Sequence, residues 1–251
     1  MSNFTTQAEQ LDESLQLSLP PVAIAFADDL PAGIPSYEDV APAGCYFWQE
    51  ASQKVFSTSA KDHELCAIGV HTHNLEGASA AQQDELMSAL EAMQGLDYVR
   101  EEEVAAIPVL QRPVRHTVYG PLADFPIDAD VVLLFAHAQQ SLILTEAAAR
   151  VDEGVPPAMG RPACAVVPQV RNGGRAAMSL GCCGARAYLD ALSDDVALWA
   201  LPGEKLEAYC KEIDGLAKSN EILTVFHERR REDVAAGKRP SVQESLERLA
   251  G

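Results

Sequence analysis

The 251-residue chain combines a strong negative charge with enough apolar residues for a sizeable core. It carries 37 Asp and Glu against 19 Lys and Arg, a net charge of −18, and 47% of its residues are hydrophobic. Nucleic acids and anionic membrane surfaces both attract clusters of Lys and Arg, so we expect neither as a partner. The length would fit one large domain or two small ones, and we predict a single domain over residues 1–251.

The N-terminal segment and the cysteine content favour a cytoplasmic protein. Met1–Phe4 leads into a polar, acidic stretch that lacks the basic start and apolar centre of a secretion signal. The longest apolar run, residues 131–136, is far too short to span a bilayer. Six cysteines are too few for a secreted disulfide scaffold of this length. In a reducing compartment, clustered cysteines more often indicate metal binding or catalysis.

The first half of the chain is predicted to alternate helices with short strands. Three helices are expected, at residues 5–18, from Asp62 to about Gly69, and at residues 79–95. Strands are expected at residues 22–26 and 54–59. In the third helix Leu86, Leu90 and Met93 share one face, a pattern typical of a helix that buries one side.

The second half is predicted to contain the most deeply buried strand, at residues 131–135, with a helix at 139–151 after it. Further strands are expected at 112–121 and 176–180, and a short apolar segment at 162–168 lies beside a glycine-containing loop. A long helix at 204–232 and a short one at 241–249 end the chain. Because strands and helices alternate, the predicted class is α/β or α+β, with a mixed sheet flanked by helices and a long C-terminal helix.

A Gly-Cys-Cys-Gly turn at residues 181–184 is the most distinctive stretch of the sequence. It follows an apolar strand and leads into a helix, and its glycines allow a sharp turn. A cysteine at a helix N-terminus is favoured as the thiolate, which binds metals and attacks electrophiles. Adjacent side chains diverge, so we expect Cys182 to be functional, with Cys183 turned into the core or acting as a spare.

Cysteines in two earlier segments are candidate partners of this turn. Cys45 follows a glycine in a loop, and Cys66 lies near the end of a predicted helix. They form no C-x-x-C pair, so their spacing alone does not identify a site. Three separate elements that each supply a cysteine suit a dispersed, sulfur-rich site for a soft metal. The alternatives are cysteines that only pack in the core and a catalytic thiol. Cys164, in an apolar run between prolines, is interpreted first as a core residue.

Histidines near Cys66 could add ligands or proton donors to such a site. His63 lies three residues before Cys66 and could face the same way on a helix. His71 and His73 have the spacing of a strand or loop and could bind zinc or iron, or donate protons. A surface or hydrogen-bonded histidine is the alternative in each case. His137 ends the best strand, where ligands bind in open α/β sheets.

Arg186, two residues beyond the cysteine turn, is a candidate for binding an anionic substrate or for balancing the charge of a cluster. The alternative is an arginine on a helix surface. The sequence contains no P-loop, G-x-G-x-x-G, G-x-S-x-G or H-E-x-x-H motif. Nothing therefore indicates a nucleotide cofactor or a serine-hydrolase mechanism.

Several motifs occur in an order that resembles one known family. In chain order they are Pro21–Ile24, Cys45, Cys66–Gly69, Tyr119–Leu122, Asp130–Leu134, Cys164, Ser179–Arg186 and Trp199–Pro202. Over roughly residues 8–240 this order resembles the bacterial and archaeal family called domain of unknown function 169. The family has no settled function. The resemblance implies that Cys45, Cys66 and Cys182 belong to a shared pattern and that Cys183 does not.

The first functional hypothesis is an iron–sulfur protein. Cys45, Cys66 and Cys182 would ligate a [4Fe–4S] cluster, and Cys164 or Cys183 would supply the fourth ligand unless that position stays open. An open iron would act as a Lewis acid in lyase chemistry, and four ligands would favour electron transfer. Arg186 and a histidine such as His71 would bind or protonate a small-molecule substrate.

The second hypothesis is a zinc protein without turnover. The same cysteines, with His63 or His71, would form a closed tetrahedral site for structure, sensing or storage. A third hypothesis is a metal-free thiol enzyme with Cys182 as the nucleophile. Expected partners are a small molecule or a redox protein, and the sequence also allows a homodimer.

Overall fold

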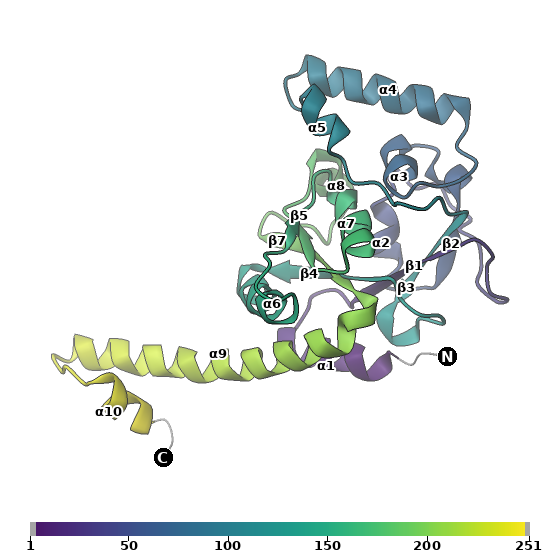
Figure 1. Cartoon of the computed structure of the whole chain (residues 1–251). Coiled ribbons are helices and arrows are strands. Elements are labelled where there is room, and N and C mark those ends of the chain that lie inside the picture. Colours follow the sequence, from purple (N-terminus) through teal and green to yellow (C-terminus); the bar gives the residue numbers. More distant parts are fainter. Residues whose placement is uncertain (1–3, 249–251) are drawn as a thin grey trace.

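A seven-stranded sheet forms the centre of the protein in the computed structural model, which describes residues 4–248 (Figure 1). The strand order is β2-β3-β1-β4-β7-β6-β5. The pair β5–β6 is parallel and every other neighbouring pair is antiparallel, so the predicted mixed sheet is confirmed. The strands are β1 (Val22–Ala27), β2 (Phe56–Thr58), β3 (His116–Pro121), β4 (Val131–His137), β5 (Ala158–Met159), β6 (Ala177–Ser179) and β7 (Val196–Pro202).

The central strands are buried on both faces, which explains their unbroken apolar sequences. In β4, Val131, Leu133 and Phe135 enter the core on one face of the sheet, whereas Val132 and Leu134 enter the core on the other. Side chains alternate in this way because successive residues of a strand point to opposite faces. The fold therefore has three layers, with helices on each side of the sheet.

One face is covered by α1 (Thr5–Leu15), α6 (Ala138–Val151) and the first part of α9 (Leu206–Ala235). Asp152, buried at the end of α6, connects this layer to the sheet. Its carboxylate accepts hydrogen bonds from the Ala176 backbone N–H at 2.9 Å and the Tyr209 hydroxyl at 2.6 Å, and it pairs with Lys205 at 3.0 Å. A buried carboxylate needs such partners because an unpaired buried charge is costly.

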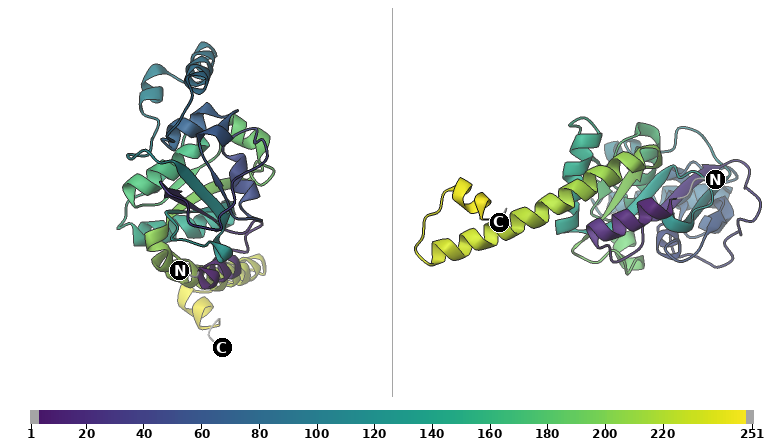
Figure 2. Two further views of the ribbon diagram at one scale, coloured as in Figure 1. Left: turned by 90° about the vertical axis from the view of Figure 1, so that its right-hand side faces the viewer. Right: turned by 90° about the horizontal axis from the view of Figure 1, so that it is seen from below.

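The opposite face carries four short helices: α2 (Tyr46–Glu50), α3 (Ala67–Thr72), α7 (Val166–Gly173) and α8 (Cys183–Tyr188). Short 3₁₀ helices, η1 (Ala60–His63) and η3 (Ala163–Ala165), lead toward α3 and α7, and η2 (Leu122–Asp124) and η4 (Gly203–Lys205) follow β3 and β7. Beyond this layer lie α4 (Ala80–Gly95) and α5 (Glu101–Ala105), on the side of the sheet away from α1 and α9 (Figure 2).

Most predicted elements are present, with several differences of substance, and helix α2 was also not predicted. Strand β7 was not predicted, and helix α7 lies where a short apolar segment and a loop were expected. The helix expected from Asp62 to Gly69 is instead two pieces, η1 and α3, because the chain becomes extended at Cys66, with φ −142° and ψ 72°. In α4 the face with Leu86, Leu90 and Met93 is only half-buried.

The first helix ends earlier than predicted, whereas the last begins as predicted, and its predicted end at residue 249 lies outside the described residues. Helix α1 stops at Leu15 rather than residue 18, because Gln16 takes a left-handed conformation with φ 52°. The C-terminal helix α10 (Val242–Glu247) begins after the predicted Ser cap, and the hydroxyl of Ser241 accepts the Glu244 N–H. Within residues 4–248 no helix combines the length and the apolar character needed to cross a bilayer.

Candidate functional site

Four cysteines from four separate segments come together on the α2–α8 face of the sheet. Three of them directly precede short helices: Cys45 before α2, Cys66 before α3 and Cys182 before α8. The fourth, Cys164, lies in η3. All four pack in the same hydrophobic cluster, with Cys45 and Cys164 buried and Cys66 and Cys182 half-buried. The group therefore reaches from the core towards the surface.

Burial and mutual proximity raise the pKa values of three of these thiols, those of Cys45, Cys66 and Cys164. Burial first, and then the neighbouring thiols Cys66 and Cys182, raise the pKa of Cys45 to about 12. Burial also raises the pKa of Cys66, and it raises that of Cys164 well above its usual range. Each of the six pairs within the group interacts electrostatically, so the four thiols share one region of the structure. At neutral pH the folded chain without a metal therefore holds Cys45, Cys66 and Cys164 as neutral thiols.

Backbone N–H groups point at the sulfur atoms. The Ala185 N–H donates to Cys182 Sγ at 3.5 Å in the first turn of α8. The backbone N–H groups of Gly44 and Gly69 lie near the sulfur of Cys66 and oppose the rise in its pKa, and the Gly69 N–H also donates to the Cys66 carbonyl at 3.0 Å. Such donors stabilise a thiolate more than a thiol, so they favour the form that binds a metal.

His63 lies against the same two glycines as the Cys66 sulfur. A Cβ atom on Gly69 would lie 2.8 Å from His63 Nδ1 and 3.3 Å from Cys66 Sγ. A Cβ atom on Gly44 would lie 2.9 Å from His63 Nδ1 and 3.6 Å from Cys66 Sγ. The imidazole is buried, and burial lowers its pKa to about 4. Its Nδ1 has no hydrogen-bond partner within the described part of the chain, while Nε2 lies 3.4 Å from Thr58 Oγ1.

A second buried histidine continues this polar group into the core. The rings of His63 and His73 are 6.1 Å apart, and burial lowers the pKa of His73 to about 3. His73 Nδ1 lies 3.5 Å from the hydroxyl of Tyr119, whose pKa is raised by burial. Tyr119 also interacts electrostatically with Cys66 and Cys164. Both imidazoles are therefore neutral at pH 7, and a polar path leads from the thiols to Tyr119.

The comparison with known protein families identifies the family of the chain. A family model described as "Uncharacterised ArCR", that of domain of unknown function 169, matches residues 10–212. The chain belongs to this family. The matched range includes all four grouped cysteines, both buried histidines and Tyr119, whereas most of α9 and all of α10 lie beyond it. No curated protein and no solved structure matches the chain.

Cys164 joins the group although its sequence context favoured core packing. Its sulfur is buried, interacts with the other three thiols and lies within hydrogen-bonding reach of the Thr72 hydroxyl. Cys183, in contrast, is exposed rather than turned into the core, and it is not among the thiols that interact with one another. Cys210 is buried on α9, in the core of the opposite face.

Arg186 holds the cysteine turn in place. Its guanidinium donates to the backbone carbonyls of Leu180, Leu192, Ser193 and Val196, the last three at 3.3, 2.7 and 3.3 Å. These contacts join the turn to the segment that leads into β7. They use most of the N–H donors that were expected to face a substrate. Gly181 completes the arrangement with φ +90°, a conformation that other residues rarely adopt.

The remaining candidates lie away from the thiols or at the surface. His71 is exposed in the last turn of α3, with a pKa lowered by partial burial. His137 pairs with Asp195 at 3.1 Å and lines a cavity of about 470 Å³ together with Gln49 and Gln53. The residues lining that cavity include none of the four cysteines.

The four sulfur atoms are not arranged around a single ion. As the side chains stand, no three His, Cys, Asp or Glu residues between positions 4 and 248 form a group that would hold one metal ion. The chemistry of the donors, four thiols with backbone N–H groups aimed at two of them, nevertheless suits a soft metal. Sequence reasoning did not single out Thr58, and it placed Tyr119 in a motif of the family resemblance without expecting it beside the thiols.

Proposed function

We propose that Cys45, Cys66, Cys164 and Cys182 hold a [4Fe–4S] cluster used in redox or lyase chemistry on a small molecule. The observation that carries this proposal is the gathering of four thiols, from segments up to 137 residues apart in the sequence, on one face of the sheet. Thiolates select iron–sulfur clusters and other soft metals. The cysteines lie near the starts of short helices, where backbone N–H groups favour thiolates.

The residues around the thiols fit such a group. Gly44 and Gly69 leave the Cys66 sulfur without a neighbouring Cβ, and their backbone N–H groups lower the pKa of its thiol. His63 Nδ1 is buried beside this sulfur without a hydrogen-bond partner in the described chain, and leaving a buried donor or acceptor unpaired costs about 1–3 kcal/mol. A cluster sulfide or thiolate beside Nδ1–H would satisfy it. Hydrogen bonds to sulfur also set the reduction potential of such clusters.

The buried Cys164 supports its assignment as the fourth ligand in preference to the exposed Cys183. When bound, a cluster with four thiolates supplies one-electron transfer, and a cluster with an open iron supplies a Lewis acid. Cys66 and Cys182 lie at the half-buried edge of the group, so a substrate or a redox protein would approach from that side. Arg186 acts here by positioning Cys182, not by binding the substrate.

Protonation links the site to its surroundings. The thiols must lose their protons when metal binds, and burial raises the pKa of three of them. His73 and Tyr119 are both neutral, and Tyr119 interacts electrostatically with Cys66 and Cys164. All six cysteines are free thiols, which suits the reducing conditions of the cytoplasm that we propose as the location.

A closed zinc site is the second candidate. The unpartnered His63 Nδ1 beside Cys66 favours it, since three cysteines and one histidine form a common structural zinc site. This arrangement would need the side chains to move together around one ion, whereas a cluster bonds each thiolate to a separate iron.

Anaerobic purification of the full chain separates these proposals. We expect iron and acid-labile sulfide in equal amounts, about four of each per chain, with a broad visible absorption band that bleaches on reduction. One zinc per chain without sulfide would replace the cluster by the closed zinc site. A chain that stays free of iron after reconstitution with iron and sulfide would overturn the cluster proposal.

A further inference from the structure

The C-terminal part of the chain forms an arm that projects from the rest of the fold. The arm consists of residues 218–248, and the body of residues 4–217. Helix α9 packs on the sheet only through its first part, up to Ala217, and then continues past the body, with α10 against its far end (Figures 1 and 2). The arm also lies wholly beyond residue 212, where the match to the family ends.

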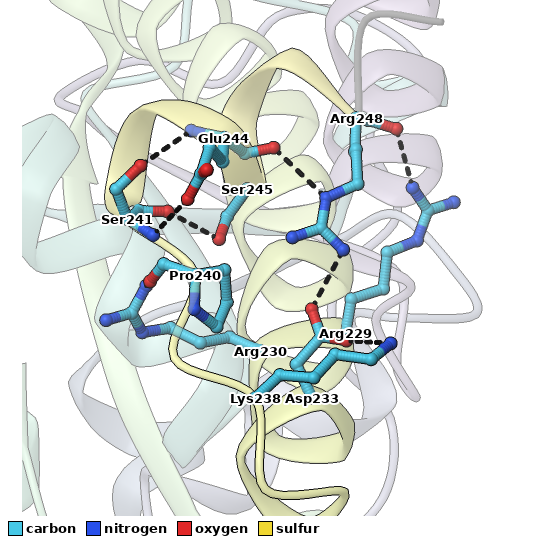
Figure 3. Close-up of polar contacts among 9 residues, drawn as sticks. All are labelled: Arg229, Arg230, Asp233, Lys238, Pro240, Ser241, Glu244, Ser245 and Arg248. Atoms are coloured by element: carbon cyan, nitrogen blue, oxygen red, sulfur yellow. Dashed lines mark hydrogen bonds and ion pairs between the residues drawn. The ribbon is translucent and has the colours of Figure 1, made fainter.

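The tip of the arm is a defined helical hairpin rather than a loose tail (Figure 3). Asp233 of α9 pairs with Lys238 at 3.0 Å and with Arg248 at 2.9 Å. Arg229 donates to the backbone carbonyl of Arg248 at 2.9 Å, and Arg230 donates to that of Pro240 at 3.1 Å. These contacts fix α10 against α9, so the arm presents a preformed surface.

Exposed apolar side chains are concentrated on this arm. Of the 16 large apolar side chains that are exposed within residues 4–248, six lie in the arm's 31 residues: Ile222, Leu223, Val225, Val234, Val242 and Leu246. Three of these occupy one turn of α9, with Ile222 58% exposed and Leu223 47% exposed. Single exposed apolar residues are ordinary, but a group of them on a projecting element marks an interaction surface.

The charge of the chain is divided unequally between body and arm. Residues 1–217 carry 31 Asp and Glu and 12 Lys and Arg. Residues 218–251 carry six Asp and Glu and seven Lys and Arg. Two bodies therefore repel each other strongly, but two arms do not. The 18 residues of α9 from 218 to 235 rise 1.5 Å each and therefore extend about 27 Å. This length exceeds the Debye length, which is about 8 Å at physiological salt.

We propose that the exposed apolar side chains of the arm bind the arm of a second copy of the chain, so that the protein is a dimer joined through α9. The contact pairs the Ile222–Val225 turn of each copy with the same region of its partner, as a two-fold symmetric interface requires. The arms bury their apolar side chains, and their length keeps the two acidic bodies apart. No metal is involved, so this proposal and the cluster proposal stand or fall separately.

Sedimentation and light scattering of the full chain test the proposal. The wild type is expected at twice the 27.0 kDa chain mass at concentrations of about 50 μM. The double substitution Ile222→Asp and Leu223→Asp should raise the dissociation constant at least ~100-fold and give monomers. The matched control is Met87→Asp, which changes a 56% exposed side chain on α4 and should leave the dimer intact. A monomeric wild type, or equal dissociation by the control, would overturn the proposal.

Two further measurements distinguish the arm–arm contact from an arm bound to the acidic body of the other copy. Raising the salt concentration should preserve or strengthen an arm–arm dimer, because it screens the repulsion between bodies, whereas it would weaken a contact between unlike charges. A photo-crosslinking residue at position 223 should form links to residues 218–248 of the partner. Crosslinks to residues 4–217 would overturn the arm–arm contact. Val225→Asp serves as a second variant if the double substitution fails to fold.

Discussion

Replacing Gly69 with alanine is a sensitive test of the packing of His63 and Cys66. The added methyl group would lie 2.8 Å from His63 Nδ1 and 3.3 Å from Cys66 Sγ, both closer than ordinary contacts. His63 cannot easily move away, because it is 1% exposed and its ring packs 4.9 Å from that of Phe47. Overpacking of this kind costs about 1–3 kcal/mol.

An opposing effect must be subtracted from that cost. Gly69 lies within the short helix α3, where alanine is favoured over glycine by up to about 1 kcal/mol. The overpacking is the larger effect, so the free energy of unfolding of Gly69→Ala should fall by about 1–2 kcal/mol. The matched control is Gly215→Ala in α9, where no atom lies within 4 Å of the added Cβ. That change should stabilise the protein by about 0.5–1 kcal/mol.

Urea unfolding of the metal-free chain in reducing buffer measures both changes, with the buried Trp48 and Trp199 as fluorescence probes. In a His63→Ala background the methyl group at position 69 gains space, and Gly69→Ala should become neutral or stabilising. If Gly69→Ala stabilises the wild type as Gly215→Ala does, or keeps its full penalty without the imidazole, the described packing of His63 is wrong.

Three further predictions concern protonation and the cysteine turn. The metal-free chain should lose stability as the pH falls below about 6.5, because burial lowers the pKa of His63 to about 4 and that of His73 to about 3, so the unfolded state binds protons first. Each histidine contributes at most about 1.4 kcal/mol per pH unit to the dependence of the free energy of unfolding on pH. His63→Gln should reduce this pH dependence in urea titrations from pH 7 to 5. An unchanged pH dependence would argue against a neutral imidazole at His63. Arg186→Ala leaves backbone carbonyls unpaired and should lower the free energy of unfolding by more than about 2 kcal/mol. The control Arg112→Ala removes a surface ion pair with Asp28 and should lower the free energy of unfolding by less than about 1 kcal/mol. Similar losses in the two variants would contradict the positioning role of Arg186. The apparent affinity of the chain for Co²⁺ should rise between pH 6 and 8, because metal binding must release thiol protons. Calorimetry in buffers of different ionisation enthalpy measures this proton release. A pH-independent affinity would contradict the binding of Co²⁺ by these thiols.

Periodicity and turn chemistry predicted most of the fold, and the failures have local causes. Helix α7 was missed because Pro168 and the glycines at 173 and 174 are typical of loops. Pro168 lies in the first turn of α7, where its missing N–H would have had no partner in any case. Strand β7 was missed although Ser193–Asp195 precede its apolar residues and Pro202–Gly203 end them, which are turn signals that bound a strand. In the structure it pairs with β4 along its whole length.

The cysteine site was predictable in its residue types but not in its full composition. The glycines and helix starts around Cys45, Cys66 and Cys182 mark positions where the backbone is close to the sulfur. Cys164 gave no such signal, because an apolar run between prolines describes a core cysteine and a buried ligand equally well. Arg186 was expected at a substrate, but its partners are carbonyls of the 189–196 segment, a contact between elements that sequence spacing does not encode. The role of all these residues in binding a metal remains a prediction.

The most direct test of the cluster proposal is the iron and sulfide content of single cysteine-to-serine variants after anaerobic reconstitution. Cys45→Ser, Cys66→Ser, Cys164→Ser and Cys182→Ser should each lose most of the iron or bind an altered cluster. Cys183→Ser removes an exposed thiol adjacent to Cys182, and Cys210→Ser removes a buried thiol on the opposite face, so both should keep the wild-type content. Loss confined to the first four variants is the predicted result. Full iron content in the Cys164→Ser and Cys182→Ser variants, or equal loss in Cys183→Ser, would contradict the proposed site.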